Sequence, residues 1–193
     1  MATATASAKS AAAGVLSLKV TLRDTKPPVW RRLLAPGTMT LAALHRAIQA
    51  SMGWYDCHLH SFEIDGRHYS AKDMMDAHLD ERRVTLNSLL KIGVDKFRYT
   101  YDFGDGWDHA ILIEKSVAAV PGQHTPACIA GKRNCPPEDC GGAWGYAELL
   151  EILADPAHPE HDGKMEWLDG GFDPEAFSVG DANERMQNWV DLN

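Results

Sequence analysis

The stretch from Phe97 to Glu114, FRYTYDFGDGWDHAILIE, alternates aromatic or aliphatic side chains with polar ones on both sides of a Gly-Asp-Gly sequence. Such a period of two is typical of a β-strand that buries one face. Because two alternating runs flank a glycine-rich break, the stretch predicts a β-hairpin. This hairpin constrains the fold more than any other part of the chain.

The register of the hairpin decides which polar residues meet. A three-residue loop at 104–106 pairs Asp102 with Asp108. It also pairs Tyr101 with His109 and gathers the aromatic and isoleucine side chains on one face. A two-residue Asp-Gly turn would pair Asp102 with His109 but would place polar residues on the aromatic face. We therefore expect the three-residue loop, in which two opposed carboxylates need a cation or a basic side chain between them.

The N-terminal half predicts strands around one helix. Residues 16–22 and 29–34 alternate as half-buried strands on either side of a proline-rich turn. Residues 40–52 begin with a threonine that can cap a helix and carry apolar side chains at helical spacing. Residues 59–64 and 67–70 flank an Asp-Gly pair, which is a strong hairpin signal.

The C-terminal half predicts a long loop followed by helices. Residues 117–142 are rich in proline, glycine and cysteine, which predicts a loop. A loop of this length is expected either to be held by a stabilising interaction or to have a function. Residues 144–153 have the spacing of a helix, and shorter helices are expected after them. The predicted fold class is α+β, with a mixed or antiparallel sheet of hairpins, a packed helix at 40–52 and helices toward the C-terminus. The opening order of strand, strand and helix resembles a β-grasp arrangement.

The length suits one domain with a tail. Residues 1–14 are rich in alanine, serine and threonine and read as a disordered tail, 15–168 as the domain, and 169–193 as its helical extension. No run reaches the roughly 18 apolar residues of a membrane span, and the N-terminus has no signal-peptide pattern. We therefore expect a cytoplasmic protein whose four cysteines are free thiols or metal ligands.

The net charge of −8 is unevenly distributed. Residues 1–50 hold seven basic side chains and one acid, whereas the remaining residues hold 12 basic and 26 acidic ones. A polarised chain of this kind can present a basic edge to DNA or to an acidic protein. The candidate contact is the basic N-terminal hairpin with Lys19, Arg23, Lys26, Arg31 and Arg32. The alternative is that the two halves neutralise each other within the fold.

Five sequence blocks in a fixed order resemble a known family. They are PPVWRR at 27–32, LHRAIQASMGW at 44–54, HLHSF at 58–62, YDFGDGWDH at 101–109 and CPPEDCGGAWGY at 135–146. Together they are similar to the plasmid pRiA4b ORF-3-like family, which is uncharacterised and associated with plasmids and mobile elements. The resemblance implies a shared fold and an accessory role in such elements. A relationship of this family to transposon resolvases has been suggested. However, no serine of this sequence lies in a recognisable context for a resolvase nucleophile.

The cysteines of the predicted loop are candidate zinc ligands. Cys128, Cys135 and Cys140 are spaced loosely, and three thiolates with one imidazole would make a closed structural site. His109 is the expected fourth ligand because it belongs to a matched block, and His124 is the alternative. The competing interpretation is that the three are ordinary buried thiols.

An acidic group is the second candidate site. It comprises Asp102, Asp105 and Asp108 around the hairpin, with Glu138 and Asp139 before the helix. Converging carboxylates can bind a divalent cation and activate water. Alternatively, the aspartates belong to turns, the later pair caps a helix, or Arg31 or Arg32 neutralises them.

Histidines and tryptophans complete the candidates. His58 and His60 would share one face of a strand, either as a ligand pair or as core histidines. Arg31 and Arg32 should point to opposite faces, so that one pairs with an acid of the hairpin. Most of the tryptophans in the matched blocks are expected in the core.

Two functions follow from these patterns. The first is a non-enzymatic binding protein with a structural zinc held by Cys128, Cys135, Cys140 and His109. The second is a metal-dependent hydrolase with phosphodiesters as its candidate substrates, which uses Asp102, Asp105, Asp108 and His109. A structural site is closed by cysteines, whereas a catalytic site is rich in carboxylates and open to water.

Overall fold

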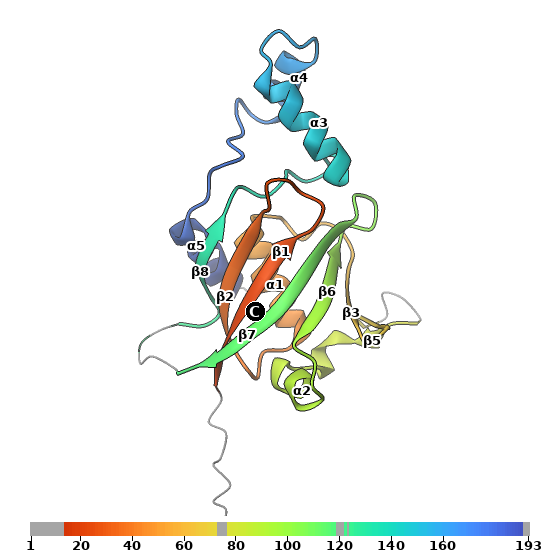
Figure 1. The fold of residues 1–193 in the computed structure, drawn as a ribbon, viewed down its shortest axis with the longest axis vertical. Coiled ribbons are helices and arrows are strands. Elements are labelled where there is room, and N and C mark those ends of the chain that lie inside the picture. Colours follow the sequence, from red (N-terminus) through yellow and green to blue (C-terminus); the bar gives the residue numbers. More distant parts are fainter. Residues whose placement is uncertain (1–13, 73–76, 119–121, 123, 191–193) are drawn as a thin grey trace, which may run out of the picture.

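One eight-stranded sheet forms the body of the molecule in a computed structural model that describes residues 14–72, 77–118, 122 and 124–190. The strand order is β5-β4-β3-β6-β7-β1-β2-β8 (Figure 1). The strands are β1 (Val15–Leu22), β2 (Trp30–Pro36), β3 (His60–Ile64), β4 (Arg67–Ser70), β5 (Leu79–Asp80), β6 (Lys96–Tyr101), β7 (Trp107–Val117) and β8 (Ala127–Lys132). Every pairing is antiparallel except that of β4 with β5.

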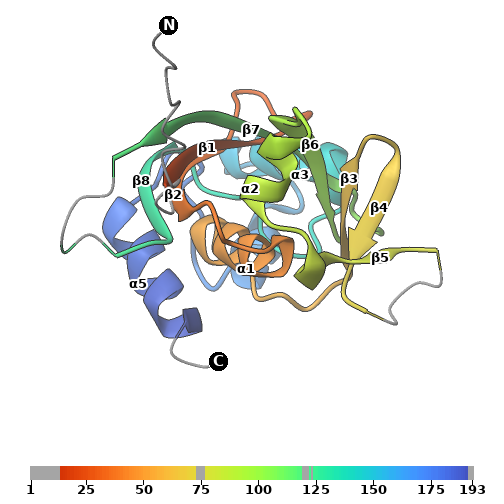
Figure 2. The same ribbon diagram turned by 90° about the horizontal axis from the view of Figure 1, so that it is seen from below.

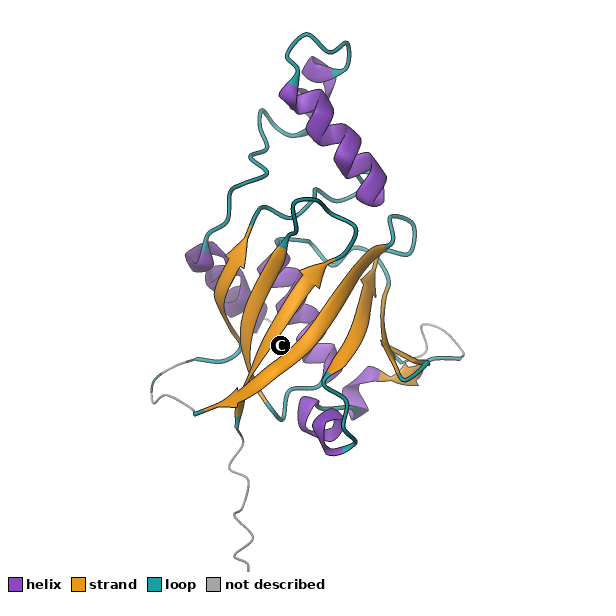
Figure 3. Cartoon of the chain, viewed as in Figure 1, coloured by secondary structure: helices purple, strands orange, loops and turns teal. Residues whose placement is uncertain are grey.

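Helices lie beside and beyond this sheet (Figure 3). They are α1 (Leu41–Met52), the short 3-10 helix η1 (Glu81–Arg83), α2 (Leu86–Lys91), α3 (Gly142–Ala154), α4 (His161–Trp167) and α5 (Val179–Val190). The predicted α+β class is confirmed. Within the described residues, no helix has the length and hydrophobicity that a membrane crossing requires.

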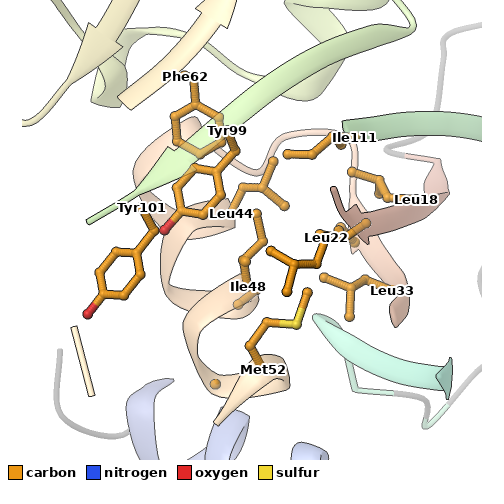
Figure 4. Packing of buried hydrophobic residues seen from close by; sticks show 14 of the residues in the cluster. Leu18, Leu22, Leu33, Leu44, Ile48, Met52, Phe62, Tyr99, Tyr101 and Ile111 are labelled. Carbon is orange, nitrogen blue, oxygen red and sulfur yellow. The ribbon is translucent and has the colours of Figure 1, made fainter. Parts of the chain in front are cut away.

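The sheet curves around α1, which occupies its concave side with α5 beside it (Figure 2). Leu44, Ile48 and Met52 of α1 project into the core, where β-strand side chains such as Leu18 and Tyr99 meet them (Figure 4). Burying a large apolar side chain contributes roughly 1.5–3 kcal/mol, so this layer supplies much of the stability.

The predicted ends of α1 are those of the structure. The Thr40 side chain accepts a hydrogen bond from the backbone N–H of Ala43, which satisfies an otherwise unpaired donor of the first turn. Gly53 ends the helix with a φ of 97°, a left-handed conformation that favours glycine. The chain then turns back toward β3.

The hairpin of β6 and β7 has a different register from the predicted one. Tyr101 pairs with Trp107 and Tyr99 with His109, so the connection runs from Asp102 to Gly106. Asp102 adopts a φ of 54° and leaves the strand, and its carbonyl accepts the N–H of Gly106. The aromatic face of the two strands is buried as predicted, whereas Phe103, which was expected on that face, is 43% exposed. Asp102 and Asp108 are not opposite each other, because the longer tip absorbs the difference in spacing.

The predicted loop at 117–142 contains a strand that the sequence analysis missed. β8 pairs with β2 and forms one edge of the sheet, with a register shift near Arg32 and Leu33. Its sequence, ACIAGK, shows neither a clear alternation of apolar and polar residues nor an enrichment in β-branched residues. An edge strand that is covered by a helix needs neither pattern. The predicted tail lies almost entirely outside the described residues, and the domain boundaries stay predictions.

Arg31 and Arg32 point to opposite faces of β2, as predicted. Arg31 is 1% exposed, and its guanidinium donates to the carbonyls of Ser51, Trp30 and Lys132. It also stacks on Phe177, 4.0 Å from the ring centroid. Arg31 is therefore a structural residue of the interior and not part of a basic surface.

Arg32 lies on the opposite, convex face. It forms a two-pronged ion pair with Glu114 of β7, with both nitrogen–oxygen distances at 2.8 Å. The predicted pairing of one of these arginines with an acid of the hairpin is thus confirmed for Arg32. The neutralised guanidinium contributes little to a basic contact.

We predict that these neighbouring arginines differ sharply in their effect on stability. Arg31→Met would remove the guanidinium that donates to the carbonyls of Ser51, Trp30 and Lys132, and it should lower the free energy of unfolding by about 3 kcal/mol. Arg32→Met breaks a partly exposed ion pair and should cost about 1 kcal/mol or less. Urea unfolding of the two variants measures both values, and equal losses would contradict the interior role of Arg31.

Candidate metal centre

One end of the sheet collects four connecting segments. The strand registers place the ends of β1, β6 and β8 and the starts of β2, β3 and β7 at this end. The segments are 23–29, 53–59, the hairpin tip 102–106, and 133–141. We call them the strand-end surface, which lies at the top of the sheet below α3 in Figure 1. Residues far apart in the sequence therefore meet here.

The imidazole of His58 lies on this surface among three carboxylates. Its Nε2 is 3.7 Å from Oδ2 of Asp102, 3.9 Å from Oε2 of Glu138 and 3.2 Å from Oδ1 of Asp139. The Nε2 atom is nevertheless buried and makes no hydrogen bond. We call these four residues the His58 cluster.

Backbone geometry holds Asp102 in this cluster. Because β6 ends at Tyr101, the Asp102 N–H donates to the carbonyl of Leu59 at 2.9 Å. Its Oδ1 accepts the N–H of Gly104 at 2.9 Å, which leaves Oδ2 to face His58. The side chain is only 9% exposed, so the carboxylate is aimed inward.

Glu138 is held from two sides through one of its oxygens. Its Oε1 accepts the N–H of Tyr55 at 2.9 Å and the hydroxyl of Tyr101 at 3.1 Å. Burial is the main cause that raises the pKa of Tyr101, so the phenol stays protonated and donates. The other oxygen, Oε2, is buried without a hydrogen-bond partner and faces His58.

The charges of the cluster do not balance. Three carboxylates surround one imidazole, and in the described part of the chain no lysine or arginine forms an ion pair with Asp102, Glu138 or Asp139. Holding unpaired carboxylates out of water is costly, so they need a cation or bound protons. A protonated His58 would balance only one of the three charges.

Two overlapping sets of donor atoms that share His58 fit a divalent metal ion. In one set the ligand atoms of His58, Asp102 and Asp139 lie within 4.8 Å of one another, and in the other those of Cys57, His58 and Glu138 do. An ion bound at about 2.0–2.3 Å by each ligand needs ligand atoms at such separations. A site of imidazole and carboxylates binds Zn²⁺, Mn²⁺ or Fe²⁺ better than a site of carbonyl oxygens alone binds these ions.

One side of the cluster is open to solvent. The Asp139 side chain is 70% exposed, whereas that of Asp102 faces the interior. A pocket of about 460 Å³ borders Asp139 and Cys140 and extends to Lys164 and Trp167 of α4. An ion at the cluster would therefore have coordination positions that a ligand or water can reach.

The tip aspartates that the sequence analysis grouped together have separate roles. Asp108 forms an ion pair with Arg98 at 2.8 Å and accepts the hydroxyl of Thr100 at 2.6 Å. Asp105 accepts the N–H of Gly141 at 3.1 Å and so joins the tip to the start of α3. Only Asp102 belongs to the His58 cluster, so the predicted catalytic set of Asp102, Asp105 and Asp108 does not form one site.

The contact between the tip and α3 is close. A Cβ atom added to Gly142 would lie 2.3 Å from the carbonyl oxygen of Asp105. Gly142 also has a φ of 68°, which disfavours any other residue. The loop that carries Glu138 and Asp139 is therefore pressed against the hairpin at this point.

The structure does not bring the predicted zinc ligands together. The groups of metal-ligating atoms within 4.8 Å in the described residues include none of Cys128, Cys135, Cys140 or His109. The Arg31 guanidinium acts electrostatically on Cys128, Cys135 and His109, so a cation already lies in their midst. Burial raises the pKa of the thiols of Cys128, Cys135 and Cys140, and it raises that of Cys140 to about 12. Zinc at this set stays a prediction to which the geometry adds no support.

His109 lies in the interior. Its Nδ1 N–H donates to the carbonyl of Trp107 at 2.9 Å, and its Nε2 is buried without a partner. Burial lowers its pKa to about 4, and the Arg31 guanidinium acts in the same direction. His109 is therefore a neutral core histidine between the sheet and Trp54.

His60 belongs to a second histidine cluster and not to that of His58. His58 lies in a bend before β3, so the predicted shared strand face does not exist. The rings of His60 and His45 stack with centroids 3.5 Å apart. Their Nε2 atoms contact carboxylates of Glu81 and Asp56, each at 2.8 Å.

This stacked pair resembles a metal site only in composition. Ligand atoms of His45, Asp56 and His60 lie within 4.8 Å of one another. However, the rings are parallel within 6°, so their in-plane lone pairs cannot converge on one ion. Each ring also has its own carboxylate partner, which makes the pair a satisfied structural network.

A family model described as "Plasmid pRiA4b ORF-3-like protein" matches residues 14–181. The chain belongs to the plasmid pRiA4b ORF-3-like family. It is 41% identical over 180 residues to "Uncharacterized protein y4hQ" of Sinorhizobium fredii, and the match covers 91% of this chain and 92% of that protein. The pRiA4b ORF-3-like chain is also similar to the crystal structure of a protein of unknown function, MM3350, from Methanosarcina mazei Go1. That similarity has a TM-score of 0.81 and 39% identity, and it covers 86% of this chain and 96% of the other.

Most members of the His58 cluster stand out in the sequence but were expected in different groups. Asp102, Glu138 and Asp139 were expected in an acidic site, whereas His58 was expected beside His60. Cys57 is exposed, and its Sγ lies 3.8 Å from the hydroxyl of Tyr101. The available signal was that these residues all fall in or beside the family blocks.

We predict that His109 makes the protein sensitive to acid. The unfolded chain binds a proton on this histidine at a pKa of about 6.5, whereas burial holds the folded value at about 4. The unfolded state therefore takes up more protons as the pH falls through this window, and the free energy of unfolding should fall by about 3 kcal/mol.

The measurement is urea unfolding across this pH range for the wild type and for His109→Phe. The variant should show a shallower loss, because it removes the titrating group and keeps an aromatic ring. His124→Gln changes an exposed histidine and should keep the slope of the wild type. An unchanged slope in His109→Phe would assign the acid sensitivity to other groups.

Proposed function

We propose that this protein binds a divalent metal ion at the His58 cluster and that its function depends on that ion. The observation that carries the proposal is the buried, unpartnered Nε2 of His58, which faces Oδ2 of Asp102, Oε2 of Glu138 and Oδ1 of Asp139. Two of these facing atoms, His58 Nε2 and Glu138 Oε2, have no hydrogen bond, although both are buried. A metal ion satisfies such atoms and the charge together.

The surroundings support an ion that acts on a ligand. A structural zinc is usually closed by four protein ligands, whereas an active ion keeps a position for water or substrate. The exposed Asp139 and the pocket that borders it provide such a position. Glu138 is fixed by Tyr55 and Tyr101, so the ligand set is held in place without the ion.

Hydrolysis is a second candidate function, and the open side of the cluster favours it. An ion at this site lowers the pKa of a bound water, and a neighbouring carboxylate can accept the proton. The exposed carboxylate of Asp139 is the one that could accept this proton. This set differs from the predicted one, because only Asp102 is common to both.

The other expectations stay predictions. A structural zinc at Cys128, Cys135 and Cys140, an accessory role in mobile elements and a cytoplasmic location have no support from the contacts described above. In the predicted basic hairpin, Arg31 is buried and Arg32 is paired with Glu114. Contact with DNA or an acidic protein would therefore depend on Lys19, Arg23 and Lys26.

We predict that titration with Mn²⁺ or Zn²⁺ shows one bound ion. Asp102→Asn removes an inward-facing ligand charge and should weaken binding at least about 100-fold. Asp108→Asn is the matched control, because it changes an aspartate of the same hairpin that is paired with Arg98. Isothermal titration calorimetry measures both variants.

Metal content of a Cys135→Ser/Cys140→Ser variant separates the two candidate sites. This variant should keep the ion, because neither thiol belongs to the described ligand groups. Loss of the ion from the cysteine variant together with normal binding by Asp102→Asn would overturn the proposal and favour the cysteine site.

We predict that the Mn²⁺-loaded protein hydrolyses the model diester bis(4-nitrophenyl) phosphate. Asp102→Asn and Glu138→Gln should abolish release of nitrophenol, since both disturb the ion, while Asp108→Asn should retain it. A spectrophotometric assay follows the product. Tight metal binding without any turnover would reject the hydrolytic candidate and leave a metal-dependent binding protein.

A further inference from the structure

Exposed aromatic side chains are concentrated around the His58 cluster. Among the described residues, four aromatic rings are strongly exposed: Tyr55 at 81%, Phe103 at 43%, Trp144 at 90% and Trp167 at 47%. Tyr55 and Phe103 lie within three residues of cluster members in the sequence. Trp167 lines the pocket that Asp139 borders, and Trp144 lies in the first turn of α3. A group of exposed apolar side chains beside a polar site marks a binding surface.

Local structure explains why each ring points outward. Phe103 leaves the aromatic face of the hairpin because Asp102 adopts a left-handed conformation and ends β6. Trp144 lies between the inward-facing Gly142 and Tyr146 of α3. These positions tolerate polar side chains, so burial in the core does not account for aromatic residues there. The rings are placed by the same loops that place the metal ligands.

Free basic side chains occur at the same end of the sheet. Arg23 and Lys26 are exposed in the connection between β1 and β2, and Lys132 is exposed at the end of β8. In the described part of the chain, the recorded ion pairs involve none of these three. The backbone N–H of Arg23 donates to the carbonyl of Asp108, which ties this connection to the hairpin. The strand-end surface, together with the adjoining Lys132, Trp144 and Trp167, therefore combines aromatic rings, a metal-ligand cluster and unpaired cations.

We propose that the strand-end surface binds single-stranded nucleic acid. Bases stack on exposed aromatic rings, phosphates pair with lysine and arginine, and a divalent ion held by carboxylates coordinates a phosphate oxygen. The last of these contacts rests on the metal site proposed above. The ligand is single-stranded because paired bases are stacked on each other and cannot reach separate rings.

Charge complementarity favours this ligand over a basic peptide only when the ion is bound. Without the ion, the carboxylates of Asp102, Glu138 and Asp139 repel phosphate and attract a cationic partner. With the ion, this part of the surface accepts an anion, and Arg23, Lys26 and Lys132 extend the attraction. Binding of nucleic acid should therefore be stronger with the metal than without it, and it should weaken with added salt.

Fluorescence anisotropy with labelled DNA and RNA strands of about 12 nucleotides tests the proposal, since single-strand sites span several bases. The full-length protein is loaded with Mn²⁺. Trp144→Ala and Tyr55→Ala should each weaken binding about 10-fold, because each removes a stacking platform. Ile92→Ala is the control, since it truncates a side chain that is 69% exposed after α2, at the opposite end of the sheet.

The arms of this experiment separate the two proposals. Trp144→Ala should bind Mn²⁺ normally by calorimetry, while Asp102→Asn should lose both the ion and most of the nucleic-acid affinity. If the protein binds no ion but still binds single strands through Trp144 and Tyr55, the metal site fails and the nucleic-acid surface stands. Equal affinity for duplex and single strand, unchanged affinity in both aromatic variants, or binding only of a polylysine probe would overturn the nucleic-acid proposal.

Discussion

The Glu138 carboxylate joins the loop before α3 to the rest of the strand-end surface. Its Oε1 accepts hydrogen bonds from Tyr55 and Tyr101, which belong to the segment after α1 and to the central strand β6. One carboxylate thus joins three parts of the chain that are distant in sequence. Because Oε1 is occupied in this way, Oε2 is left to face His58. These two hydrogen bonds act together with those from Trp54 to Pro136 and from Gly141 to Asp105, which also hold the loop before α3 against the sheet.

The two histidine clusters show how the same residue types serve different purposes. His45 and His60 are stacked, buried and each paired with a carboxylate, so their polar atoms are satisfied within the protein. In the His58 cluster, buried polar atoms face one another without hydrogen bonds, and one carboxylate is open to solvent. Composition does not separate the two arrangements. Ring orientation and the pairing of individual atoms do.

Sequence reasoning succeeded where a local pattern determines structure. The alternation at 97–113 correctly assigned the buried face of the central hairpin, and Thr40 and Gly53 correctly bounded α1. The register failed because Asp102 takes a left-handed conformation, which an aspartate adopts without any sequence signal that distinguishes it from a strand residue. β8 was missed because it becomes a strand only when β2 offers it an edge.

The site was predictable in its parts but not in its assembly. The acidic residues stood out by type, and His58 stood out as one of two histidines in HLHSF. Their meeting depends on three loops that converge at one end of the sheet, and no local period encodes that convergence. The cysteines attracted attention by number, yet the interior where they lie already holds the guanidinium of Arg31, whose burial was not foreseeable from an Arg-Arg pair on a strand.

The backbone contact between Gly142 and Asp105 has a bearing on which ion the protein would accept. Main chain meets main chain there without an intervening side chain, so the two ligand-bearing loops lie close together, and a side chain at position 142 would push them apart. A narrow spacing discriminates by ionic radius: calcium, with oxygen ligands at about 2.3–2.6 Å and six to eight of them, needs a wider cage than Mn²⁺ or Zn²⁺. The absence of a side chain outside the coordination sphere would in this way favour the smaller ions.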